Sequence, residues 1–230
     1  MGKTKLYDGY KPFMPIRAFK GYNKWLEVYQ HNISFDKLSE DAKKFTIDSQ
    51  TYYTSYPHFI EYFRKLESIT KHNLIIGINF TYGWMPTTFK FKSENPDNSF
   101  RKTLAILNQA KKADGVLNYP QIETLKQFFN NSLVGTSKLL HFVCPKSVPI
   151  WDSNVYRYIT GTEPYDNRIG DIEAYMSYVE FCYYITAFDR YTELHRQVEA
   201  KVGHPISKFR SVELIMYYNG RKSFFKPKNS

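Results

Sequence analysis

Residues 133–155, with the sequence LVGTSKLLHFVCPKSVPIWDSNV, carry the clearest structural signals in the chain. Residues 133–136 predict a tight connection around Gly135, and a helix follows over about 137–144, where Pro145 ends it. Beyond Pro149, Asp152 stands where an N-cap residue would precede another helix over 153–159. This segment therefore predicts a connection, a helix, an irregular link and a further helix in close succession.

The residues upstream predict a helix that leads into this connection. Pro120 suits a first helical turn. The apolar residues after it repeat at helical spacing and form one stripe: Ile122, Leu125, Phe128 and Phe129. Residues 130–132, Asn-Asn-Ser, then break the helix. The whole pattern over about 118–160 is therefore helix, hairpin, helix.

Apolar periodicity predicts helices over most of the remaining chain. The segments are 22–30, 55–70, 99–112, about 171–200 and about 207–218, after an irregular arm over 1–20. Residues 74–80 suit a buried helix or a strand equally, and a turn at 83–86 leaves a short β-hairpin near 74–92 open. We therefore predict an all-α fold, a single domain over 1–230 with two helical lobes around a cleft.

The charge balance favours a polyanionic partner. The chain has 32 basic and 22 acidic side chains and a formal net charge of +10, spread along its length. Such an excess favours phosphate binding through counterion release. Aromatic residues make up 18% of the chain; tyrosine-rich surfaces suit wet clefts, although an A/T-rich genome also explains much of this bias.

Several classes of protein are disfavoured by what the sequence lacks. Cys144 and Cys182 lie far apart in apolar surroundings, which predicts two buried thiols in a reducing compartment and no iron–sulfur cluster. The histidine spacing predicts no metal site, and there is no P-loop. Without a signal peptide or an apolar run of the ~20 residues that span a membrane, we expect a soluble, cytoplasmic, nucleoid-associated protein that needs no cofactor.

The pattern over 118–160 resembles the core of the helix-hairpin-helix DNA glycosylases, the superfamily of endonuclease III and the 8-oxoguanine DNA glycosylases. In that family a Leu-x-Gly-x-Gly hairpin and a helix lead to a Val-Pro-x-Asp-type stretch whose Asp begins the next helix. Gly135 and Asp152 match these positions, and residues 209–214 give a weaker echo in the closing helix. The resemblance implies a monomeric enzyme that binds double-stranded DNA and removes a damaged or modified base by hydrolysis of its N-glycosidic bond.

Asp152 and Lys138 are the catalytic candidates that this resemblance implies. A carboxylate at 152 would stabilise the positive charge that develops on the sugar and orient the attacking water; the alternative is a helix cap with no further role. Lys138 is either a Schiff-base nucleophile, which would add AP lyase activity, or a clamp for a phosphate. Ser137 holds the register of the family's lysine, and Lys138 lies about four residues closer to the Asp than is usual there.

Other candidates would hold the DNA or the base. The backbone N–H groups of Gly135, Thr136 and Ser137 are expected to bind a phosphate at a helix N-terminus, with Arg157 as a further phosphate contact. The candidates for a base pocket are His141 and Trp151, both of which are also ordinary core residues. The turn over 83–87 is a further candidate to cover the cleft. The spacing of Arg210 and Glu213 most simply predicts an ion pair on the surface.

Two alternatives to a glycosylase remain at this stage. The second glycine of the family's hairpin is missing, which favours a non-catalytic helix-hairpin-helix protein that binds DNA without excising anything. A protein-binding or defence-system component that reuses the fold is the other alternative.

Overall fold

The computed structural model describes residues 22–47, 50–85, 87–90, 96–115 and 117–221, and in these residues the chain is all-α, without a strand. The predicted arm over 1–20 lies outside them. The helices are α1 (Tyr22–Asn32), α2 (Phe35–Lys44), α3 (Gln50–Lys65), α4 (Lys71–Gly83), α5 (Pro96–Lys112), α6 (Tyr119–Phe128), α7 (Leu133–Val143), α8 (Ser153–Thr160), α9 (Asp166–Ile169), α10 (Ile172–Thr186), α11 (Tyr191–Val202) and α12 (Lys208–Asn219).

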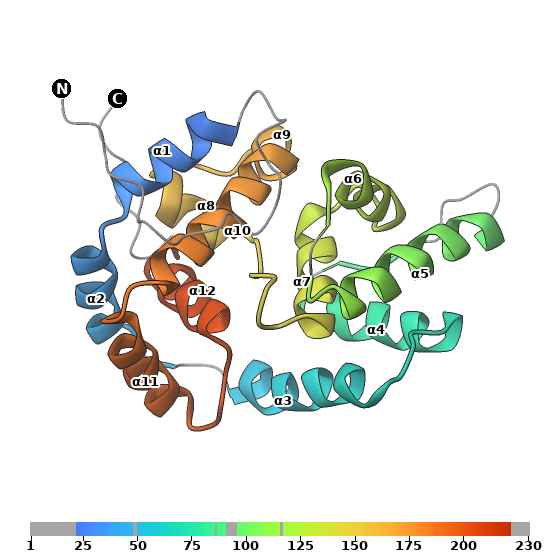
Figure 1. Cartoon of the computed structure of the whole chain (residues 1–230), viewed down its shortest axis with the longest axis horizontal. Helices are drawn as coiled ribbons and strands as arrows, with labels where there is room; N and C mark the ends of the chain where they lie inside the picture. The colour runs from blue at the N-terminus through green and yellow to red at the C-terminus, as the bar shows by residue number, and fades with distance from the viewer. Residues whose placement is uncertain (1–21, 48–49, 86, 91–95, 116, 222–230) are drawn as a thin grey trace.

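The helices form two groups that lie side by side (Figure 1). The first group contains α3 to α7, with α7 packed against α3, α4, α5 and α6. The second contains α1, α2 and α8 to α12, with α1 on α10 and α8 on α12. The groups touch where α6 packs against α10, and a link over 144–152 leads from α7 to α8.

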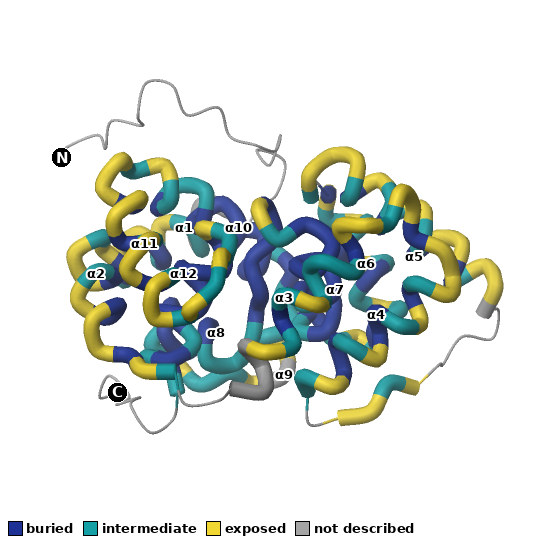
Figure 2. Tube along the Cα trace, turned by 90° about the horizontal axis from the view of Figure 1, so that it is seen from below, coloured by how far each residue is buried: buried dark blue, intermediate teal, exposed yellow. Residues whose placement is uncertain are grey.

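Apolar burial holds each group together. Buried residues lie on the inner sides of the helices and where the groups meet, whereas exposed residues lie on the outer sides (Figure 2). In α10 and α12 most residues are buried, because apolar side chains cover most of their circumference. Cys144 and Cys182 are free and buried, as predicted.

The turn before α7 differs from the prediction. Helix α7 begins at Leu133, four residues earlier than expected, and Ser132 caps it by accepting a hydrogen bond from the Gly135 N–H at 3.0 Å. The chain reverses instead at Asn130 and Asn131, whose φ angles are 58° and 59°. Asparagine tolerates this left-handed region better than most residues, so the turn does not need a glycine.

Three other expectations about secondary structure are corrected. The alternative of a β-hairpin near 74–92 is wrong for the described part of that segment, because α4 runs through residue 83 and no strand follows before residue 91. The helix expected over 171–200 is two helices, α10 and α11, separated by a turn at 187–190. The sequence did not predict α2 or the short α9. None of the described helices is long and apolar enough to cross a bilayer.

Candidate functional site

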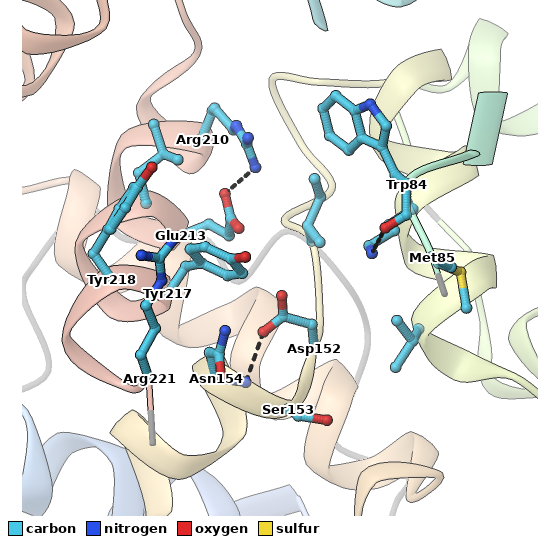
Figure 3. A pocket seen from close by; sticks show the side chains of 14 residues that line it. Trp84, Met85, Asp152, Ser153, Asn154, Arg210, Glu213, Tyr217, Tyr218 and Arg221 are labelled. Carbon is cyan, nitrogen blue, oxygen red and sulfur yellow. Dashed lines mark hydrogen bonds and ion pairs between the residues drawn. The ribbon is translucent and has the colours of Figure 1, made fainter. Parts of the chain in front are cut away.

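A cavity of about 380 Å³ lies where the two groups of helices meet. The end of α4 and one side of α7 form one wall, and the start of α8 with α12 forms the other (Figure 3). The residues that line the cavity are Trp84, Met85, Val134, Lys138, Ile150, Asp152, Ser153, Asn154, Arg210, Glu213, Leu214, Tyr217, Tyr218 and Arg221. Five of these side chains carry a charge, so the cavity suits a polar ligand.

Asp152 is the N-cap of α8, as predicted, and its carboxylate also faces the cavity. Oδ1 accepts hydrogen bonds from the N–H groups of Asn154 and Val155, both at 2.9 Å. Oδ2 has no hydrogen-bond partner among the described residues and is available to a ligand. The link before it is fixed, because Ser137 Oγ accepts from the Trp151 N–H at 3.0 Å.

Lys138 reaches the same cavity from α7. Its Nζ donates a hydrogen bond to the carbonyl oxygen of Trp84 at 3.3 Å, which is a long and weak contact. Burial lowers the pKa of Lys138, and the positive charge of Arg210 acts in the same direction, whereas Asp152 and Glu213 oppose the shift. A lysine with a lowered pKa has more of its amine in the unprotonated, nucleophilic form.

Arg210 and Glu213 form a buried ion pair on the cavity wall, so the expected surface pair is wrong. Their exposed fractions are 6% and 2%, and Arg210 Nη1 donates to Glu213 Oε2. Burial raises the pKa of Glu213 to about 7, against the opposing effect of Arg210. A signal for this burial was present in the sequence, because apolar residues surround the pair in α12, and a helix that is apolar on all sides is buried.

Aromatic rings line the cavity beside these charges. Trp84 stacks on Tyr56 with ring centroids 6.1 Å apart, and the Arg210 guanidinium lies over both rings. On the opposite wall Arg221 lies over the rings of Tyr217 and Tyr218. The turn that begins at Gly83 therefore does reach the cavity, through Trp84 and Met85, whereas Pro86 lies outside the described residues.

The expected phosphate site at the hairpin is wrong. Gly135, Thr136 and Ser137 lie inside the first turns of α7 and are buried. The Gly135 N–H is bound by Ser132 Oγ and the Thr136 N–H by the Ser132 carbonyl. These amides already have partners within the chain, so they do not point outward toward a phosphate.

Three more candidates are buried away from the cavity. His141 is hydrogen-bonded through both ring nitrogens, to Tyr56 Oη at 2.8 Å and to the Val148 carbonyl at 2.5 Å, and burial lowers its pKa to about 3. Trp151 is a core residue whose Nε1 donates to the Ile169 carbonyl at 2.9 Å. Neither lines the cavity. Arg157 is buried between Glu163 and Asn154, so it is not a surface contact for DNA.

Comparison of the chain with protein-family models, curated proteins and solved structures finds no match. In the described part of the chain, no three His, Cys, Asp or Glu side chains gather as metal ligands. The residues of the cavity itself therefore carry the functional inference.

Proposed function

We propose that the chain is a DNA N-glycosylase that removes a damaged or modified base from duplex DNA, with Asp152 and Lys138 as its catalytic residues. One observation carries the proposal: α7 and the start of α8 bring these two side chains to one cavity that aromatic rings also line. The formal net charge of +10 supports a polyanionic substrate.

Asp152 suits the transition state of N-glycosidic cleavage. As the C1′–N bond breaks, the sugar gains positive charge, and a fixed carboxylate beside it stabilises that charge. The cap hydrogen bonds hold Oδ1 in place, whereas Oδ2 can face the sugar or accept a proton from the attacking water. The same carboxylate thus serves the helix and the reaction.

Lys138 suits a nucleophile that attacks C1′. Its lowered pKa increases the fraction of free amine, and its hydrogen bond to the Trp84 carbonyl oxygen is long enough to be exchanged for a contact with substrate. An amine bonded to C1′ leads to a Schiff base and, from there, to strand cleavage. We therefore propose AP lyase activity in addition to base removal.

The cavity offers the setting that an everted base requires. A base taken out of the duplex is held by stacking on aromatic rings and by hydrogen bonds to its edge. Trp84 lies on one wall and Tyr217 on the other, with Arg210 and Glu213 on the same helix as Tyr217 as polar partners (Figure 3).

A base-release assay on a panel of lesion-containing and modified duplexes tests the proposal. Asp152→Asn should abolish release while DNA affinity and thermal stability stay close to the wild type, because asparagine also caps helices. The matched control is Asp171→Asn, since Asp171 caps α10 through the same two-bond pattern and does not line the cavity. Release that survives Asp152→Asn, or falls equally in both variants, would contradict the proposed role.

Borohydride trapping tests Lys138 separately. The wild type should form a covalent adduct with damaged DNA, and Lys138→Met should not. Lys111→Met is the control, because Lys111 also donates to a backbone carbonyl, that of Phe63, at a site outside the cavity. Base release without an adduct would leave a monofunctional glycosylase, and DNA binding without release of any base would favour the non-catalytic alternative.

A further inference from the structure

Glu213 is the carboxyl group of the cavity that takes no part in the bond-breaking steps proposed for Asp152 and Lys138. Its side chain is 2% exposed, yet it contributes to the cavity wall. Oε2 is bound by Arg210, and Oε1 has no hydrogen-bond partner among the described residues. One oxygen is therefore anchored and the other is available to a ligand in the cavity.

The two carboxyl groups of the cavity lie in different settings. Asp152 accepts hydrogen bonds from two backbone N–H groups at the start of α8. Glu213 is enclosed by helices, and its pKa of about 7 keeps a large fraction protonated at neutral pH. A pair of carboxyls whose surroundings differ in this way is the usual arrangement of a fixed carboxylate and an acid.

We propose that Glu213 is the catalytic acid that gives its proton to the departing base, an inference that rests on the proposed glycosylase function. The C1′–N bond breaks with its electron pair going to the base nitrogen, and the base takes the proton from Glu213. Arg210 then neutralises the new carboxylate. The nucleophile that bonds to C1′, the Lys138 amine or a water molecule, passes a proton to Asp152, and that proton returns to Glu213 through solvent, so protons and charge balance over one turnover.

Several ionisable groups face Glu213 and would act on its titration. They come from α12, α8, α7, α10 and α3, and they are Arg210, Tyr217, Asp152, Lys138, Tyr178, Cys182 and Tyr56. Arg210 and Lys138 lower the pKa of Glu213, and Asp152 raises it. Loss of a proton from Lys138 would increase nucleophilic attack as the pH rises. A rate of base release that falls as the pH rises through about 7 is therefore not due to Lys138.

The test is the pH dependence of single-turnover base release at saturating enzyme, on the duplex that the panel identifies. The wild-type rate should fall as the pH rises through about 7. Glu213→Gln should release base about 10²–10⁴-fold more slowly, which is the usual contribution of a general acid or base. Its rate should no longer fall as the pH rises through about 7. Glu180→Gln is the control, because Glu180 is equally buried, on α10, and does not line the cavity.

The outcomes separate the two proposals. If the wild type releases base at a rate that stays the same or rises between pH 6 and 8, the role of Glu213 is overturned and the glycosylase function is not. This result does not depend on whether Glu213→Gln folds. A folded Glu213→Gln that matches the wild type in rate and profile overturns it too. A wild type that releases no base from any duplex overturns the proposed function itself.

Discussion

At the scale of single residues, the cavity holds charges that cost stability. Glu213 and Lys138 both have pKa values that burial shifts toward the uncharged form. Removing one partner of a buried ion pair strongly destabilises a protein, whereas replacing both partners by apolar groups often does not. Folding alone therefore gives little reason to keep Arg210 and Glu213 at this position, which is consistent with a role in binding or chemistry.

The raised pKa of Glu213 predicts how stability depends on pH. Its folded-state pKa is about 7 and its ordinary value 4.5, so the folded state holds more protons between these limits. Its unfavourable contribution is absent below about pH 4.5 and grows until the pH passes about 7, where it reaches about 3 kcal/mol. Relative to Glu213→Gln, the free energy of unfolding of the wild type should therefore fall over this range. Urea unfolding of both proteins at several pH values measures this free energy. A difference between the two proteins that stays the same at every pH would contradict the prediction.

The sequence located one carboxyl group of the cavity and missed the other. Asp152 could be predicted because helix capping depends only on a few neighbouring residues of the sequence. Glu213 could not be placed by its spacing from Arg210, which gives the same ion pair on an exposed helix or a buried one. Its position on a cavity wall depends on how α12 packs against α8 and α10, which no short pattern contains. For the same reason Thr136 and Arg157 were expected to contact DNA and are buried.

At the scale of elements, helices were predicted well and the hairpin between them was not. Helical periodicity repeats over many residues, so α1, α3, α5, α6, α8 and α12 lie close to the predicted segments. The turn was assigned to Gly135 because glycine is the usual residue where φ is positive. Asn130 and Asn131 adopt that conformation instead, and Gly135 lies in the first turn of α7.

Two glycines should therefore respond in opposite ways to alanine. A Cβ at Gly135 would meet its nearest neighbours at 3.4 Å, an ordinary contact, and alanine favours a helix over glycine by about 0.5–1 kcal/mol. A Cβ at Gly220 would come within 1.9 Å of the Asn154 carbonyl oxygen, next to the cavity. Gly135→Ala should raise the melting temperature, and Gly220→Ala should lower it by an amount that reflects overpacking of about 1–3 kcal/mol. Destabilisation by Gly135→Ala would mean that its backbone is under a constraint that the helix does not explain.

At the scale of the whole molecule, the cavity depends on how the two groups of helices are placed. Trp84 and Lys138 come from one group, and Asp152 with Glu213 comes from the other. Two helical lobes were predicted from the sequence, but their relative position follows from long-range contacts such as α6 on α10. That is why the two proposed catalytic residues could be named in advance while the walls around them could not.

The net charge leads to a prediction for the intact protein. Binding to duplex DNA should weaken as salt rises, with a linear fall of the logarithm of the affinity against the logarithm of the salt concentration, because phosphate neutralisation releases counterions. Fluorescence anisotropy with a labelled duplex between low and moderate salt measures the slope. An affinity that does not change with salt would contradict a polyanionic partner and favour a protein partner instead.

The order of the helices along the chain has a consequence for how the molecule forms during translation. Helices α3 to α7 are continuous in sequence, whereas the other group joins α1 and α2 to helices that follow α7 in the chain. As the chain leaves the ribosome, α3 to α7 can pack at once, while α1 and α2 must wait for α10 and α12. A nascent chain that already contains Lys138 and Asp152 thus lacks a closed site until α12 arrives, and incomplete chains should be inert toward DNA bases.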